Sequence, residues 1–301
     1  MAGEHDFIER LRAIATDPAA RGLIDDAAVL TIGGATLVLT HDALVEGVHF
    51  LTSDPPESVA WKLLAVNLSD LAAKGATPLG ALFGHTLTGD DSWDAAFAGG
   101  LEAALAHFDV PLLGGDTVRA KERHLAMTLI GEASGPVPSR AGARGGDALF
   151  VTGTLGDAGL GLELSRRGGD EDLIAAYRRP APQLEAGRLL APHVSAMMDV
   201  SDGLLIDASR LAAASGLAVA IDLDTVPLSD GYRAVRGGDR AARLAAAIAG
   251  DDYQLLFAAS LPLPALPCRV TRLGRLTEGS GLALHDRNGV IPLPASLGWE
   301  H

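Results

Sequence analysis

Several acidic residues of this sequence stand at the ends of apolar stretches, where a carboxylate without a partner is costly. They are Asp25, Asp26, Asp42, Asp70, Asp116, Asp199 and Asp202. Gly, Ser and Thr residues near them let a ligand approach the backbone and add hydroxyl oxygens. Because carboxylates without Cys suit hard cations, Mg²⁺ is favoured over Zn²⁺, and Mg²⁺ usually binds together with substrate phosphates. The set therefore predicts a metal–phosphate site, although each acid taken alone is as well explained by a cap or a turn.

The segment MMDVSDGLLIDAS, residues 197–209, indicates how such acids are positioned. Its first residues are typical of a strand, Ser201 or Asp202 of a cap, and the remainder of a helix with apolar side chains at helical spacing. A strand-to-helix turn would present Asp199 and Asp202 side by side. Asp207, one helical turn further on, is expected at the surface.

The elements that must position the acids alternate along the chain. Strands are expected over 35–42, 81–87, 124–135, 148–155, 217–223 and 253–260, helices over 57–75, 92–108 and 239–249, and a hairpin over 270–286. The stretch 135–147 is rich in Gly, Pro and Arg and has no apolar period, which predicts a domain boundary. The expected fold class is α/β (α+β), with an N-terminal domain over 1–137 and a C-terminal domain over 138–301.

Composition excludes several classes of protein. The chain has 301 residues, 48% of them hydrophobic, and a formal charge of −14, which argues against a nucleic-acid or anionic-membrane partner. The single cysteine, Cys268, rules out a disulfide within the chain and suits a reducing compartment. The charged N-terminus is unlike a secretory signal, and no apolar run reaches the roughly 18 residues of a membrane span. We therefore expect a cytoplasmic protein.

Two further segments leave alternatives open. TGTLGDAGLGL, residues 152–162, opens a helix whose amides can cradle a phosphate, but tight strand–helix packing explains its glycines at least as well. Arg140, in the segment SRAGAR, is either a phosphate-binding cation or a solvated linker charge. We find no nucleophile elbow, no His pair at metal spacing and no Cys–His couple, so covalent catalysis has no candidate.

Six motifs occur in an order and spacing that resemble the thiamine-monophosphate kinase family, within the aminoimidazole ribonucleotide synthetase-like superfamily. They are LVEGVHF (44–50), VNLSDLAAKGATP (66–78), GGDT (114–117), VTGTLGDAGLGL (151–162), MDVSDGL (198–204) and GDDYQLLF (250–257). The resemblance covers essentially the whole chain. VNLSDLAAKGA and MDVSDGL have relatives across the superfamily, whereas LVEGVHF is more particular to the kinases.

The resemblance implies a kinase whose phosphate acceptor is itself a phosphate group, forming thiamine diphosphate from thiamine monophosphate and ATP with several Mg²⁺ ions. It implies the two-domain fold of that superfamily, with an N-terminal domain that dimerises through its sheet and a site in the cleft between the domains. A homodimer is therefore expected, with no nucleic acid or membrane as partner.

The resemblance also implies roles for individual residues. The implied Mg²⁺ ligands are Asp25, Thr40, Asp42, Asp70, Asp116, Asp199 and Asp202. The implied ATP contacts are Gly115, Asp116, Arg140 and Ser201. The implied thiamine monophosphate contacts are His49, Asp251 and Trp299. Asp42, Asp116 and Arg140 would act in catalysis, because the anionic acceptor needs charge neutralisation and in-line geometry rather than a strong base.

The sequence departs from the family pattern at a few positions, so functions other than that of the kinases are also considered. Ile24 replaces a common Gly before the two acids, His41 a common Thr beside Asp42, and Gln254 a common Glu. The alternatives are another ATP-dependent enzyme of the superfamily, such as aminoimidazole ribonucleotide synthetase, a non-catalytic thiamine phosphate-binding protein, or a Mg²⁺-dependent phosphatase. A sister enzyme that relies on a reactive Cys near its N-terminus is disfavoured, because Cys268 is the first cysteine.

Overall fold

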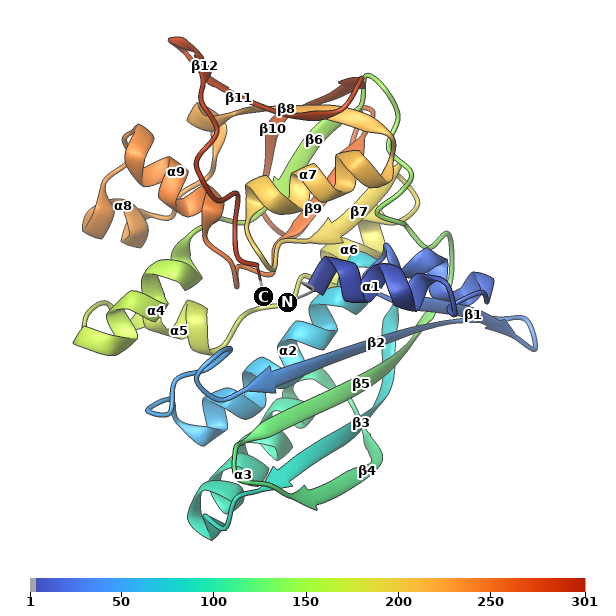
Figure 1. Cartoon of the computed structure of the whole chain (residues 1–301), viewed down its shortest axis with the longest axis vertical. Helices are drawn as coiled ribbons and strands as arrows, with labels where there is room; N and C mark the ends of the chain where they lie inside the picture. The colour runs from blue at the N-terminus through green and yellow to red at the C-terminus, as the bar shows by residue number, and fades with distance from the viewer. Residues whose placement is uncertain (1–3, 301) are drawn as a thin grey trace.

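Figure 1 shows a computed structural model of the chain, which describes residues 4–300; residues 1–3 and His301, at the outer ends of the two expected domains, lie outside it. The helices are α1 (Glu4–Arg12), η1 (Pro18–Leu23), α2 (Pro56–Ala73), α3 (Asp91–Phe108), α4 (Asp157–Arg167), α5 (Glu171–Arg178), α6 (Leu184–Leu190), α7 (Leu204–Ala214), η2 (Leu223–Thr225), α8 (Asp230–Arg236) and α9 (Arg240–Ile248). The strands are β1 (Ala28–Ile32), β2 (Ala35–Val45), β3 (Thr77–Leu87), β4 (Leu112–Arg119), β5 (His124–Ala133), β6 (Ala148–Thr152), β7 (Ala196–Asp199), β8 (Leu217–Asp222), β9 (Leu255–Ala259), β10 (Val270–Glu278), β11 (Gly281–Asp286) and β12 (Gly289–Ile291).

The N-terminal half is a sheet of five strands in the order β1-β2-β5-β3-β4, in which β3 and β4 are parallel and the other neighbours antiparallel. Alternate residues of β5 point into a core formed with α2 and α3, for example Leu125, Met127 and Leu129, which are fully buried. Within residues 4–300, no helix packs on the opposite face of the sheet, which faces the viewer in Figure 1. Buried and more exposed residues alternate along β5, as expected of a strand whose sheet is covered by helices on one face.

The C-terminal half is a mixed sheet of seven strands in the order β12-β11-β8-β10-β6-β9-β7. Its interior strands β6 and β9 are buried along their whole length, which explains why their sequences are continuous apolar runs. Helix α7 packs against this sheet and directly follows β7 through the turn at residues 200–203. This turn is the one that the sequence predicts between Asp199 and Asp202.

Helix α2 joins the two halves and lies at the centre of the molecule (Figure 1). Its apolar side chains are buried on nearly all sides, as expected of a helix enclosed by protein. Ala72 and Ala73, near its end, share a hydrophobic cluster with α6 and with strands of the C-terminal sheet. The helix ends at Ala73, with Lys74 as its C-cap, because Gly75 adopts φ +63°. A Cβ added at Gly75 would lie 2.5 Å from Ala191 Cβ.

The two-domain α/β fold expected from the sequence is confirmed, and most expected strands and helices are present within a few residues. The hairpin expected over 270–286 is wrong, because β10 and β11 do not pair with each other but flank β8 on its two sides. The sequence analysis also did not identify β1 or β4. The domain boundary expected after residue 137 falls in the segment between β5 and β6. Within residues 4–300, no helix has both the length and the apolar character that crossing a bilayer requires.

Candidate active site

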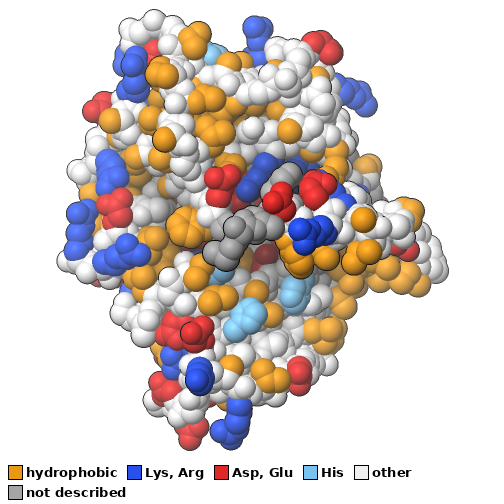
Figure 2. Space-filling view, viewed as in Figure 1, with side chains coloured by type: hydrophobic (Ala, Val, Ile, Leu, Met, Phe, Trp, Pro, Cys, Tyr) orange, Lys and Arg blue, Asp and Glu red, His pale blue; other side chains and the backbone are white. Residues whose placement is uncertain are grey.

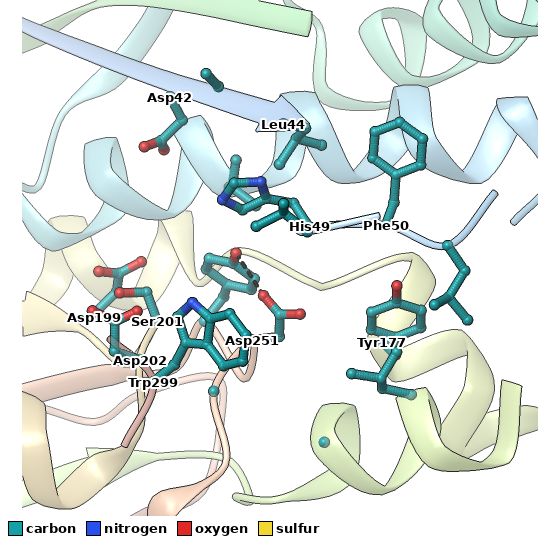
Figure 3. A pocket seen from close by; sticks show the side chains of 18 of the residues that line it. Asp42, Leu44, His49, Phe50, Tyr177, Asp199, Ser201, Asp202, Asp251 and Trp299 are labelled. Carbon is teal, nitrogen blue, oxygen red and sulfur yellow. Dashed lines mark hydrogen bonds between the residues drawn. The ribbon is translucent and has the colours of Figure 1, made fainter. Parts of the chain in front are cut away.

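A cavity of about 410 Å³ opens between β2, α2, the turn after β7, and the C-terminal segment. Eight of the residues expected in the site line it: Asp42, His49, Asp70, Asp199, Ser201, Asp202, Asp251 and Trp299. Figure 3 shows Asp42 facing Asp199, Ser201 and Asp202 at one end of the cavity, and Phe50 and Tyr177 at the other end. The cavity thus has an acidic end and a more apolar end.

Three carboxylates from different parts of the chain meet at the acidic end. Oxygen atoms of Asp26, Asp70 and Asp199 all lie within 4.8 Å of one another. Ser69, next to Asp70 on α2, donates a 2.6 Å hydrogen bond to Asp199 Oδ2 and so orients the carboxylate that ends β7. The sequence analysis included both Asp25 and Asp26 among the candidate acids, and the resemblance implied Asp25 as the ligand. In the structure it is Asp26 that lies next to Asp70 and Asp199.

The acidic end lacks enough positive charge to balance its carboxylates. Burial, together with Asp42 and Asp199, raises the pKa of Asp70 well above its ordinary value. Burial and the nearby Asp26 raise the pKa of Asp199 to about 8, and burial also raises the pKa of Asp42. A divalent cation would reverse these shifts, since oxygen ligands at this spacing are those that Mg²⁺ binds. The donor set therefore fits a Mg²⁺ ion.

Asn67 on α2 holds β2 against the cavity. Its side-chain oxygen accepts hydrogen bonds from the backbone N–H of Asp42 at 3.1 Å and from Thr40 Oγ1 at 3.3 Å. Asn67 and Thr40 are both buried, so Thr40 lies behind the cavity wall rather than among the lining residues. The amide therefore fixes the strand that carries Asp42.

Fixed cations balance the two adjacent acids Asp25 and Asp26. Lys74 forms ion pairs with both, Arg140 pairs with Asp26, and Arg21 lies 2.6 Å from Asp25. Burial alone would raise the pKa of each carboxyl, but Lys74 beside Asp25, and Arg140 with Lys74 beside Asp26, hold both pKa values below the usual range. Arg140 is thus a partly buried partner of the acid cluster and not a solvated linker charge.

Asp207 corrects an expectation, because it is fully buried rather than at the surface. Its Oδ2 accepts hydrogen bonds from the backbone N–H groups of Ser201, Asp202 and Gly203 at 3.1, 3.1 and 3.2 Å. Gly203 has φ +127°, which allows the three amides to converge on one oxygen atom. Arg210 bridges Asp207 and Asp202, so the turn after β7 is held from within helix α7.

Asp251 is fixed in the wall of the cavity by two partners. Lys62 Nζ lies 2.7 Å from Asp251 Oδ2, and Tyr253 donates a 3.0 Å hydrogen bond to Asp251 Oδ1. Both Asp251 and Tyr253 have positive φ, which is strained for residues with a side chain. Their backbone N–H groups donate to the carbonyls of Ser201 and Val200, at 2.7 and 2.8 Å, and these bonds stabilise the strained loop.

His49 and Trp299 approach the cavity from opposite sides (Figure 3). The backbone N–H of Val45 donates to His49 Nδ1 at 3.1 Å, so a neutral His49 carries its proton on Nε2. Trp299 is 54% exposed, and its backbone N–H donates to the carbonyl of Asp202 at 2.9 Å. An imidazole ring and a half-exposed indole ring thus both line the cavity.

Gly115 and Asp116 do not join the other expected site residues within one chain. They lie on β4, an exposed strand at the edge of the sheet. In the sheet register, Asp42 on β2 pairs with Met127 on β5, Met127 with Phe83 on β3, and Phe83 with Gly115 on β4. Three strand spacings of ~4.8 Å therefore separate Asp42 from Gly115, a distance of about 14 Å. A Cβ on Gly115 would lie 1.8 Å from the Phe83 carbonyl oxygen, which explains the glycine.

The sequence analysis missed several residues that shape the site. Lys62 and Lys74 on α2 and Tyr253 after Asp251 were not assigned roles. A Lys within a helix that is otherwise apolar was the available signal for both lysines, because a buried ammonium needs a carboxylate partner. Nothing comparable distinguishes Tyr253 in the sequence.

Comparison with known proteins places the chain among characterised relatives. Family models described as AIR synthase related protein, N-terminal and C-terminal domain, match residues 24–133 and 144–262. A thiamine-monophosphate kinase of Caulobacter vibrioides is 39% identical, over 99% of this chain and 90% of that protein. A solved structure described as AaThiL complexed with AMPPCP and TMP is 32% identical with a TM-score of 0.89, covering 99% of this chain and 97% of that one. The crystal structure of thiamine monophosphate kinase from Aquifex aeolicus is 31% identical with a TM-score of 0.83, covering 97% and 98%. The chain therefore belongs to the thiamine-monophosphate kinase family.

Proposed function

We propose that this chain transfers the γ-phosphoryl group of ATP to thiamine monophosphate and forms thiamine diphosphate. One observation carries the proposal: a single cavity joins a carboxylate cluster to a wall with His49, Asp251 and Trp299. The first feature suits metal-bound phosphates and the second a cationic, planar ring. The relative that matches 99% of this chain was solved with AMPPCP and TMP, which supports both halves of the reaction.

Mg²⁺ would be held at the acidic end by Asp26, Asp70 and Asp199, with Asp42 and Asp202 close by. When bound, Mg²⁺ ions neutralise the charge that develops on transferring phosphates. Roles for Thr40 and Asp25 as ligands stay predictions. Thr40 lies behind the cavity wall, where its hydroxyl donates a hydrogen bond to Asn67. Asp25 is ion-paired with Lys74 and Arg21.

The residues of the chain itself position the acceptor. Trp299 offers a face for the heteroaromatic rings, and Asp251 is an anion fixed by Lys62 and Tyr253 that suits the thiazolium or the aminopyrimidine. His49 donates a hydrogen bond through Nε2. Because the acceptor phosphate is already anionic, no strong base is required, and rate enhancement comes from alignment and charge neutralisation.

The nucleotide would contact Ser201 and Arg140 at the acidic end, together with Gly115 and Asp116. Because the latter two lie about 14 Å from Asp42 within one chain, their role at the same site calls for β4 of a second copy. The sheet face without a helix supports such a homodimer: Leu82 and Val118 on this part of the sheet are 42% and 51% exposed. Figure 2 shows hydrophobic side chains, with histidines among them, over this region.

No further partner is needed for this reaction. A net charge of −14 disfavours nucleic acid and anionic membrane surfaces. The cytoplasm supplies ATP and Mg²⁺ and keeps the lone Cys268 as a thiol, so it is the compartment that suits the proposed reaction.

An assay of ATP dependence tests the proposal. The purified chain is incubated with thiamine monophosphate and Mg²⁺, with and without ATP, and thiamine diphosphate is measured as its fluorescent thiochrome derivative. Product is expected only with ATP and Mg²⁺ together, and Asp42→Asn should abolish it. Phosphate release from thiamine monophosphate without ATP would instead indicate a phosphatase, and ligand binding without any turnover would indicate a binding protein.

A further inference from the structure

Lys74 is a buried ammonium at the edge of the acid cluster. Its side chain has no exposed surface, and its Nζ forms ion pairs with Asp25 and with Asp26, the latter at 2.7 Å. The same Nζ donates a 3.3 Å hydrogen bond to the carbonyl of Met197 in β7. A buried ammonium is tolerated only where such partners surround it, so the position of this charge is a built feature of the fold.

The end of helix α2 holds this ammonium in place. Lys74 follows Asp70 by four residues, so the two side chains lie on one face of the helix end. Gly75 turns the chain away directly afterwards and packs against Ala191 of the other half of the molecule. The helix therefore delivers one carboxylate and one ammonium to neighbouring positions.

Charge divides the acid cluster into two sides. On one side, Asp25 and Asp26 are balanced by Lys74, Arg140 and Arg21. On the other side, Asp70 and Asp199 have no ion pair with a Lys or Arg among the described residues, and they crowd each other and Asp26 within 4.8 Å. Asp26 belongs to both sides.

We infer that Lys74 is a built-in cation that takes the place of a divalent ion at Asp25 and one edge of Asp26. This inference rests on the metal site of the proposed function, and it replaces the ligand role that the resemblance implied for Asp25. Lys74 is a positioning residue: it directs Asp26 toward Asp70 and Asp199 and confines divalent ions to that side of the cluster. The chain accordingly binds fewer divalent ions than its acidic residues alone would hold.

Counting bound Mn²⁺ tests this directly. Mn²⁺ binding to the full chain is titrated by electron paramagnetic resonance in the wild type, in Lys74→Met, and in Lys121→Met as the control. Met keeps the length and removes the charge in both variants, and Lys121 is exposed on the surface. Lys74→Met should bind one more Mn²⁺, or bind the same number at least about tenfold more tightly, because a fixed positive charge beside the ligands is gone. Lys121→Met should match the wild type, and equal or weaker binding by Lys74→Met would overturn the inference.

A measurement on the wild type keeps the inference testable if Lys74→Met does not fold. Crystals of the whole chain grown with Mn²⁺ should show anomalous peaks beside Asp70 and Asp199 and none in contact with Asp25. A peak coordinated by Asp25 would show that Lys74 does not replace an ion there. Neither readout depends on thiamine phosphorylation, so loss of the proposed activity would leave this test intact. Absence of any Mn²⁺ at Asp70 and Asp199 would contradict the metal site itself.

Discussion

Lys62 Nζ lies 2.7 Å from Asp251 Oδ2, and this ion pair joins the central helix α2 to the loop that leads into β9. The same ammonium lies 4.2 Å from the centre of the Tyr177 ring and donates a 3.1 Å hydrogen bond to the carbonyl of His49. One cation thus organises three groups that line the substrate end of the cavity. Both halves of the molecule contribute to this end of the site.

Lys62→Met should weaken thiamine monophosphate binding more than it slows turnover. Asp251 and His49 would remain in the cavity but would lose the contact that fixes their positions. We therefore expect KM for thiamine monophosphate to rise about tenfold while kcat changes less. The loss of stability should be below the about 3–5 kcal/mol typical of a fully buried pair, because the Asp251 side chain is 31% exposed. Steady-state kinetics and thermal unfolding measure both effects, with Lys121→Met on the exposed surface as the control. A fall in kcat at unchanged KM would contradict this role.

Gly298→Ala should displace Trp299 from the cavity. A Cβ at Gly298 would lie 2.4 Å from Ile206 Cγ2 and 2.5 Å from the carbonyl oxygen of Asp202, the atom that accepts the Trp299 N–H. Loss of the stacking face should raise KM for thiamine monophosphate roughly three- to tenfold, in line with about 0.5–1.5 kcal/mol for an aromatic pair.

The control for this change is Gly135→Ala, because a Cβ there meets nothing within 4 Å. Trp299→Phe should retain most of the affinity and Trp299→Ala should lose it. If Gly298→Ala binds substrate as the wild type does, then Trp299 does not contribute its ring to the substrate site.

The acids of the site could be predicted from sequence because their position at the end of an apolar strand or on a buried helix is a local property. Asp42, Asp70, Asp199 and Asp202 are such cases, and all four line the cavity. Local sequence does not determine which of two neighbouring acids lies in the acid cluster. Asp25 and Asp26 are adjacent in sequence and both pair with Lys74, 48 or more residues away. Their surroundings differ because Asp25 also pairs with Arg21, whereas Asp26 lies within 4.8 Å of Asp70 and Asp199.

Long-range pairing also explains the errors of the sequence analysis. Residues 270–286 have the composition of a hairpin, but β8, from a distant part of the chain, inserts between the two strands. Asp207 has the spacing of an exposed helical residue, but the turn at Gly203 folds three amides onto it. In both cases contacts with distant parts of the fold, and not the local sequence pattern, determine the strand pairing or the burial.

Asp207→Ala should loosen the turn after β7 and weaken metal binding through Asp202. It leaves the amides of residues 201–203 without their acceptor, and each unsatisfied buried donor costs about 1–3 kcal/mol. We expect a marked fall in the melting temperature and weaker Mn²⁺ binding, measured by thermal unfolding and by titration. Asp207→Asn can still offer one oxygen to the amides and should retain most of the stability. Equal stability of the Ala variant and the wild type would show that the turn holds without Asp207.

The metal-free chain should lose stability as pH rises toward 8. The pKa of Asp199 is raised from 3.8 to about 8 in the folded protein, and that of Asp70 is raised as well, mainly by burial. A group with a raised folded pKa contributes stability that is fully present below its unfolded pKa and is lost as pH rises through the folded value. In EDTA, unfolding temperatures should therefore fall between about pH 4 and pH 8.

Mg²⁺ should reverse this slope, because the ionised carboxylates are its ligands and its affinity rises as they lose protons. Asp25 and Asp26, whose pKa values are lowered, titrate below this window and do not contribute to it. Asp199→Asn removes one of the titrating groups, so its unfolding temperature in EDTA should depend less on pH than that of the wild type. Thermal unfolding of both proteins across the pH range, with EDTA and with Mg²⁺, measures the effect. A wild-type chain in EDTA that becomes more stable toward pH 8 would show that other groups already compensate the charges of the acid cluster.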